Sequence, residues 1–204
     1  MRNKKLAVTA AVCAVAMAVS LGAGAARPQN APAAPTSGVR AEFLSGLDYF
    51  EQRFTKLAGA VPQDKYTWRP GEGVRSISEV YLHVCAANFS LPRLIGTQPP
   101  AGVDLRGLEK STTDKAKIIQ TLKDSFAHAR NAALALSDAD VEKPVKLFGQ
   151  DSTYRGAMTF ILRHLGEHLG QSIAYARMNG VVPPWTEEQQ QRQQEQKKQP
   201  EKKQ

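Results

Sequence analysis

Cysteine is scarce in this sequence of 204 residues, which contains only Cys13 and Cys85. Cys13 lies in an N-terminal segment with the features of an export signal, and removal of that segment would leave Cys85 alone. A single cysteine cannot form an intramolecular disulfide, even in an oxidising compartment. The fold must therefore rest on its hydrophobic core.

Clustered positive charge is also missing, although the formal net charge is +8. Arg2, Lys4 and Lys5 supply three of these charges, and the C-terminal segment holds a further small excess. The rest of the chain has no stripe of Lys and Arg with aromatic residues between them, which is the pattern expected for binding to nucleic acid. The composition therefore argues against a nucleic-acid partner.

Residues 1–26 have the three parts of a signal peptide: a basic start, a run rich in alanine, valine and leucine, and small residues for cleavage. The alternative is an uncleaved membrane anchor, because the run from Leu6 to Gly24 approaches the length of a membrane span. Alanine is only weakly apolar and no basic flank follows directly, which favours cleavage. The sequence predicts a periplasmic or secreted protein with no membrane contact after cleavage.

Two segments flank the predicted folded body. Residues 27–37 contain three prolines among small residues, as in a flexible spacer. Residues 186–204 are almost entirely Gln, Glu, Lys and Arg, so we expect a disordered polar tail there, or at most a fraying helical extension. Residues 38–185 remain, and they have the ordinary size of one domain with a single core.

No part of this body has a convincing strand pattern, whereas four segments have apolar residues at three- and four-residue steps, which predicts helices. Long connections separate the helices, longer than a minimal up-and-down arrangement needs. We therefore predict an all-α fold, a four-helix bundle with long connecting loops. The predicted helices run over about 38–60, 76–91, 113–136 and 154–179.

Local signals support the boundaries of these helices. Ser76 and Glu79 have the spacing of a capping box, in which each side chain bonds the backbone of the other residue. Pro92 is expected to end or kink the second helix near Leu91. Residues 141–153 look like an irregular link, and Gly180 suits the left-handed position after the last helix.

His164 and His168 lie four residues apart in the fourth predicted helix. This spacing places both imidazoles on one face, about 6 Å apart along the axis, close enough to share a metal ion. Their face also carries Phe160 and Ile161, so the pair should point inward. A lone inward histidine is more often a hydrogen-bonded core residue than a ligand. Two stacked imidazoles are harder to satisfy in apolar surroundings, because each neutral ring needs a donor and an acceptor.

A third ligand must come from another segment, and His83 is the candidate, at the edge of the apolar face of the second helix. His128 lies about 125° from the centre of the apolar face of its helix, so we expect it to be solvated and exclude it. Cys85 projects about 160° away from His83 and is expected to be a small buried residue. Glu167 lies on the charged side of the fourth helix, which indicates a surface residue.

The order and spacing of these motifs resemble the DinB-like superfamily of four-helix bundles over about residues 39–185. Trp68-Arg69-Pro70 and Ser76-Ile77-Ser78-Glu79 precede the helix-2 histidine, His83. Much later comes His-x-x-x-His-x-Gly-Gln, formed here by His164, His168, Gly170 and Gln171. The closing segment 175–185 looks like the end of a subgroup of the same family.

The resemblance implies one divalent metal ion held by His83, His164 and His168, often in a homodimer, with a small-molecule substrate at the open coordination positions. Three neutral imidazoles suit zinc, nickel or iron better than magnesium or calcium. Trp68, Gln171 and Tyr175 are candidate pocket-lining residues. Some relatives transfer low-molecular-weight thiols and others look like metal-dependent hydrolases, but an exported protein would not ordinarily meet a cytosolic thiol.

Two functions of different classes follow from these patterns. The first is a metal-dependent hydrolase or group transferase, whose substrate the sequence does not specify. The second is a non-catalytic exported metal-binding or structural bundle. The sequence offers metal ligands but no general base directed at them, and it identifies no catalytic residue.

Overall fold

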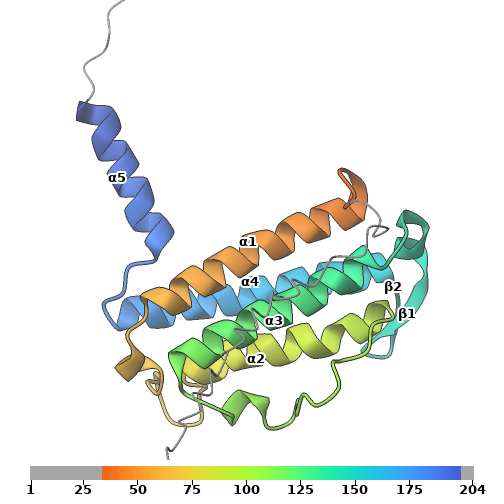
Figure 1. The fold of residues 1–204 in the computed structure, drawn as a ribbon, viewed down its shortest axis with the longest axis horizontal. Helices are drawn as coiled ribbons and strands as arrows, with labels where there is room; N and C mark the ends of the chain where they lie inside the picture. The colour runs from red at the N-terminus through yellow and green to blue at the C-terminus, as the bar shows by residue number, and fades with distance from the viewer. Residues whose placement is uncertain (1–33, 199–204) are drawn as a thin grey trace, which may run out of the picture. The chain divides into compact units, whose positions relative to one another are not determined.

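The computed structural model describes residues 34–198, whose path is shown in Figure 1. The predicted signal peptide, residues 1–26, and most of the predicted spacer, 27–37, lie outside the described residues, as do residues 199–204. Export therefore stays a prediction. Within residues 34–198, no helix combines the length and the apolar character needed to cross a membrane.

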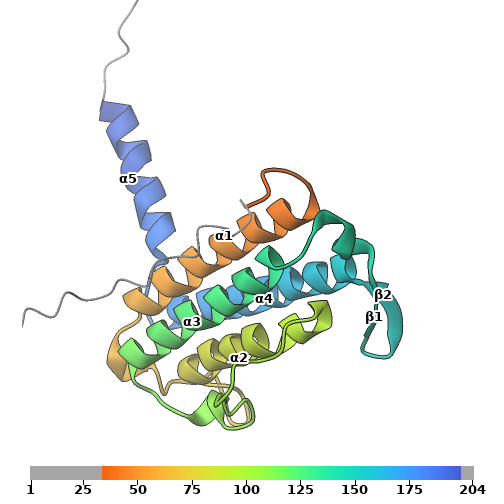
Figure 2. The same ribbon diagram turned by 45° about the vertical axis from the view of Figure 1, so that its right-hand side comes forward.

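Four long helices form the body and confirm the predicted all-α class. They pack side by side in both views of the ribbon, with α1 and α2 each in contact with α3 and α4 (Figures 1 and 2). Each lies within about two residues of its predicted boundaries. The bounds are α1 Gly38–Ala60, α2 Ile77–Ser90, α3 Lys115–Leu134 and α4 Tyr154–Met178.

Aromatic side chains from three of these helices meet in the core. Phe54 of α1 is fully buried, and its ring centroid lies 6.1 Å from that of Phe126 in α3 and 6.4 Å from that of Tyr81 in α2. Aromatic rings bury a large apolar area, so such a cluster contributes strongly to stability. It holds α2, which carries one residue of the site described below, against α1 and α3.

The start and end of α2 follow the predicted signals. The Glu79 amide donates to Ser76 Oγ at 3.3 Å, and the Ser76 amide donates to Glu79 Oε2 at 2.7 Å, which completes the capping box. After Ser90 the chain continues as a 3-10 turn, η2 Leu91–Ile95, that contains Pro92. The predicted end near Leu91 is therefore confirmed.

The link between α3 and α4 differs from the prediction, because it contains a short hairpin after the 3-10 turn η4 Asp138–Glu142. Strands β1 Pro144–Leu147 and β2 Gln150–Thr153 pair antiparallel, with Leu147 opposite Gln150. The two turn residues, Phe148 and Gly149, have φ of 50° and 84°. Two positive φ values match a type I′ turn, which ordinarily favours Asn-Gly or Asp-Gly. Because the first turn residue is phenylalanine, the sequence does not show the pattern that predicts a hairpin turn.

The structure has a further helix, α5 Pro184–Lys198, where the sequence analysis expected a disordered tail or at most a fraying helical extension. Gln, Glu, Lys and Arg are good helix formers, and proline is favourable at a first helical position, which accounts for the difference. Contacts with α1 lie near the start of α5. The Arg53 guanidinium lies 4.5 Å from the Trp185 ring centroid, and Lys56 Nζ lies 2.8 Å from Glu188 Oε1.

Candidate metal centre

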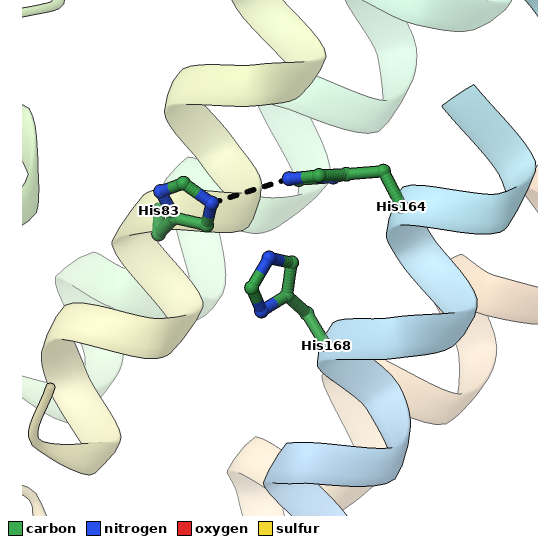
Figure 3. A group of neighbouring side chains, drawn as sticks. All are labelled: His83, His164 and His168. Atoms are coloured by element: carbon green, nitrogen blue, oxygen red, sulfur yellow. Dashed lines mark hydrogen bonds between the residues drawn. The ribbon is translucent and has the colours of Figure 1, made fainter. Parts of the chain in front are cut away.

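His83, His164 and His168 come together between α2 and α4, as the sequence predicted. Each offers a ring nitrogen, and these nitrogens all lie within 4.8 Å of one another. Figure 3 shows His83 on α2 facing His164 and His168 on α4, with His168 one helical turn along α4 from His164. The ring centroid of His168 lies 4.5 Å from those of both other rings. We call these three residues the histidine cluster.

The orientation of His83 is set by Glu109, which belongs to the 3-10 turn η3 Leu108–Lys110. Glu109 Oε1 lies 2.6 Å from His83 Nδ1, while His83 Nε2 lies 3.2 Å from His164 Nε2. Arg75 donates from Nε to Glu109 Oε2 at 2.8 Å and from a terminal nitrogen to Oε1 at 3.3 Å. Arg75 thus holds the Glu109 carboxylate, and the carboxylate in turn holds the His83 imidazole.

Glu109 is a carboxylate at neutral pH. Partial burial raises its pKa, but hydrogen bonds and attraction from Arg75 and His83 outweigh this effect, and the pKa lies below its ordinary value. A carboxylate only accepts hydrogen bonds, so His83 donates through Nδ1–H. The lone pair of His83 therefore lies on Nε2, which faces His164.

His168 is supported in a similar way from its own helix. Its Nδ1 lies 2.9 Å from Gln171 Oε1, and the Gln171 amide donates to the Tyr175 hydroxyl at 3.1 Å. The Tyr175 ring meets the Trp68 ring edge-on, with ring centroids 5.4 Å apart. The amide oxygen accepts from Nδ1–H of His168, which leaves the Nε2 lone pair available. Trp68 and Tyr175 therefore lie behind His168 in this chain of contacts, and neither lines the two cavities beside the cluster.

His164 is half-buried, as the other two histidines are. Burial, and then the neighbouring His168, His83 and Arg75, lower its pKa to about 4. Burial also lowers the pKa of His168, partly opposed by the hydrogen bond to Gln171. Both rings are thus neutral at pH 7 and can act as metal ligands. Within residues 34–198, His164 Nδ1 is buried without a hydrogen-bond partner.

Two cavities of different character lie near the cluster. One, of about 300 Å³, is lined by His83 and His164 and by mainly apolar side chains. The other, of about 620 Å³, is lined by Gln171 and by charged residues that include Arg69, Arg75 and Lys110. Glu109 contributes to both. Of the three predicted pocket-lining residues, Gln171 is the one that lines a cavity beside the cluster.

Cys85 and Glu167 lie where the sequence analysis expected them, and His128 does not. Cys85 is fully buried, and burial raises the pKa of its thiol to about 12. Glu167 is 64% exposed, consistent with a surface residue. His128 was expected to be solvated, but it is half-buried, with its ring centroid 5.9 Å from that of Phe89. Its expected exclusion from the cluster agrees with the structure, because it packs against Phe89 instead.

Glu109 and Arg75 are the residues of the site that the sequence analysis missed. Glu109 is 26 residues beyond His83 in a long link, so no helical spacing connects the two. A Glu in such a link is ordinarily a surface residue. The sequence therefore carries no local signal for its role.

The spacing of two ligand nitrogens in the cluster is close to that around a divalent ion. Two nitrogens bound at about 2.0–2.1 Å to a tetrahedral ion lie roughly 3.4 Å apart, and the Nε2 atoms of His83 and His164 lie 3.2 Å apart. The contacts of Glu109 and Gln171 also match the common arrangement in which a ligating histidine donates its other N–H to an acceptor. Three neutral nitrogen donors favour a transition metal or zinc over magnesium or calcium.

The chain is similar to known proteins in both sequence and fold. A family model described as the DinB superfamily matches residues 47–172. A DinB-like protein from Bacillus cereus ATCC 10987 superposes with a TM-score of 0.62 at 16% identity, covering 70% of this chain and 93% of that one. A DinB-like protein from Bacillus subtilis gives 0.54 at 17% identity, covering 69% and 94%. No curated protein is significantly similar. At these identities the structural likeness shows the fold alone.

Proposed function

The chain belongs to the DinB superfamily, and from that membership and its histidine cluster we propose that it binds one divalent metal ion and uses it to hydrolyse a small molecule or to transfer a group from one. His83, His164 and His168 are the proposed ligands. Zinc, nickel and iron are the metals that suit these donors best.

One observation carries the proposal. Glu109 and Gln171 each accept a hydrogen bond from the Nδ1 side of a histidine, so that His83 and His168 present Nε2 lone pairs toward the cluster. Lone pairs that face one another repel unless a proton or a cation lies between them. A bound cation accepts one lone pair from each of the three rings at once, whereas a polar network of neutral rings alone would have to share protons among nitrogens held in fixed orientations.

The neighbouring residues define what the chain contributes to a reaction. A bound ion would polarise a substrate oxygen or lower the pKa of bound water. Glu109 holds His83 in one tautomer, and Gln171 does the same for His168. The smaller, mainly apolar cavity gives a substrate access to His83 and His164, and the larger, charged cavity borders Glu109 and Gln171, which support the ligands.

A non-catalytic metal-binding bundle is the alternative, and the state of Glu109 favours it. Glu109 is the carboxylate in contact with the cluster, yet both its oxygens are engaged by Arg75 and His83 and its pKa lies below the ordinary range. A general base works best with a pKa near the operating pH. An enzyme with this site would need the metal, rather than Glu109, to activate water.

Metal content after dialysis tests the ligand set. The wild-type protein is expected to retain about one equivalent of metal, and His83→Ala, His164→Ala and His168→Ala are each expected to lose most of it while keeping helical circular dichroism. His128→Ala is the matched control, because it removes a half-buried histidine outside the cluster. Full retention by all three ligand variants would refute the site.

Turnover decides between the two functions. The metal-loaded protein is assayed with ester, amide and phosphoester substrates, before and after removal of the metal by a chelator. Hydrolysis that disappears with the metal and returns on reloading supports the enzyme. Stoichiometric metal without turnover in any assay supports the binding protein instead.

A further inference from the structure

The smaller cavity, of about 300 Å³, opens beside His83 and His164 and has a mainly apolar wall. Its polar lining consists of the two histidines, Glu109 and Ser90, and Glu109 is already engaged by His83 and Arg75. Glu109 is the charged side chain in this lining, so a charged ligand group would find no free ionic partner among the residues that line the cavity. The remaining wall is formed by Ala86, Ala87, Leu91, Leu105, Phe148 and Phe160.

Phe148 has an unusual place in this wall, at the tip of the β1–β2 hairpin. Its φ of 50° is uncommon for a bulky side chain, and the first position of such a turn is ordinarily Asn, Asp or Gly. Its side chain is nevertheless 72% exposed, so the core does not account for an aromatic residue here. Backbone strain of this kind often accompanies a functional constraint.

Phe160 connects Phe148 to the cluster. The Phe148 ring meets the Phe160 ring edge-on, with centroids 4.9 Å apart, and the Phe160 ring centroid lies 6.4 Å from that of His164. The hairpin itself packs on α4 and on η2 (Figure 1). An aromatic surface therefore continues from the hairpin tip to a proposed metal ligand.

We propose that the substrate carries a small apolar group next to the atom that reaches the metal, and that Phe148 is a specificity-determining residue for this group. The proposal rests on the proposed function, because it takes the histidine cluster as the metal site. A volume of about 300 Å³ is at the lower end for ligand pockets, so the group is a short alkyl chain or a single ring.

Straight-chain hydroxamic acids test this proposal, because they bind metal through one end and carry an alkyl chain of chosen length. The protein is loaded with cobalt(II), and dissociation constants are measured from the change in visible absorption. From acetohydroxamic to hexanohydroxamic acid, binding is expected to tighten by up to about fourfold per methylene until the cavity is filled. A chain of equal length ending in a hydroxyl group should bind more weakly.

Phe148→Asn tests the role of the side chain, because asparagine suits the turn and should preserve the hairpin. We expect the ratio of hexanohydroxamate to acetohydroxamate affinity to fall about threefold to tenfold, the range of an aromatic contact. Phe148→Leu should restore most of this ratio. Tyr49→Asn is the matched control, since it removes an exposed aromatic side chain from α1, and it should leave the ratio at the wild-type value.

The outcomes separate this inference from the proposed function. Tight binding that does not depend on chain length would overturn the apolar subsite while leaving the metal site intact. An unchanged ratio in Phe148→Asn would overturn the role of Phe148. Failure of the wild-type protein to retain cobalt through the histidines would overturn the proposed function itself.

Discussion

Glu109 Oε1 lies 2.6 Å from Nδ1 of His83, and this contact directs the opposite nitrogen of the ring toward His164. The two residues come from different elements, a long link and a core helix. The link between α2 and α3 therefore does more than connect the helices. It supplies the carboxylate that selects the tautomer of one proposed metal ligand.

Glu109→Ala is expected to weaken metal binding about 10- to 100-fold, the usual effect of removing an acceptor behind a ligating histidine. The ligand nitrogens remain, so binding should persist at higher metal concentration. Competition with a chromophoric chelator measures the affinity. Glu167→Ala removes an exposed carboxylate from α4 and should have no effect. Equal affinity of the Glu109 variant and the wild type would show that the contact is unimportant.

Gln171→Leu should weaken metal binding in the same assay, because His168 Nδ1 would lose its acceptor. We expect a change toward the lower end of the same range, about tenfold, since an amide is a weaker acceptor than a carboxylate. Tyr175→Phe removes only the hydroxyl that orients Gln171, so its effect should be smaller. A larger loss in Tyr175→Phe than in Gln171→Leu would contradict this order.

Cys85 is expected to resist alkylation in the folded protein at pH 8, because its pKa of about 12 leaves almost no thiolate. The measurement uses a Cys13→Ser background, iodoacetamide and intact mass. Complete reaction should occur after unfolding in denaturant. Rapid alkylation under native conditions would show that the α2 core opens easily or that the thiol is less buried than described.

The same pKa gives a dependence of stability on pH. Burial raises the pKa of Cys85 above the 9.0 of an ordinary thiol, so the folded state retains the proton longer than the unfolded state does. The resulting stability is complete below pH 9 and is lost between pH 9 and 12. Its slope is at most about 1.4 kcal/mol per pH unit. Comparison with Cys85→Ala isolates this contribution, because the buried tyrosines are common to both proteins.

Ser76→Ala should lower the free energy of unfolding by about 1 kcal/mol, because it removes the side-chain half of the capping box of α2. Urea denaturation of the metal-free protein measures this change. Ser137→Ala is the comparison, since it removes the hydrogen bond from the Ser137 hydroxyl to Asp140 at the start of the short 3-10 turn η4 and should cost less. The reverse order would indicate that α2 does not depend on its cap.

Deletion of residues 186–204 should change the melting temperature little, although part of this segment is the helix α5. Its ion pair, Lys56 with Glu188, joins side chains that are 50% and 43% exposed, and such pairs contribute about 0–1 kcal/mol. Trp185 and its contact with Arg53 are retained in the shortened chain. A large loss of melting temperature would mean that α5 contributes to folding.

The long helices could be predicted from the sequence because each has a periodic apolar face, as in α1, or clear capping residues, as Ser76 and Glu79 provide for α2. The hairpin could not, because β1 and β2 are short and their turn begins with Phe148 instead of a residue that favours positive φ. For α5, the sequence left a disordered tail and a fraying helical extension open. The segment has no apolar face, so its helical propensity was the only signal.

The histidines of the site were predictable to different degrees. His164 and His168 follow from spacing within one helix, a local property. His83 was selected by its place on the α2 face and by resemblance to a family. Glu109 was not predictable, because its contact with His83 depends on the path of a link that has no periodic pattern.

The distance along the chain between the cluster's members has a consequence for folding. His164 and His168 are adjacent as soon as one turn of α4 forms, so a nascent helix can already chelate an ion weakly. His83 is 81 residues away from His164 and joins them only when α2 docks on α4. For the proposed metal site, we therefore expect affinity to rise in two stages during folding, so that tight binding would report complete tertiary packing.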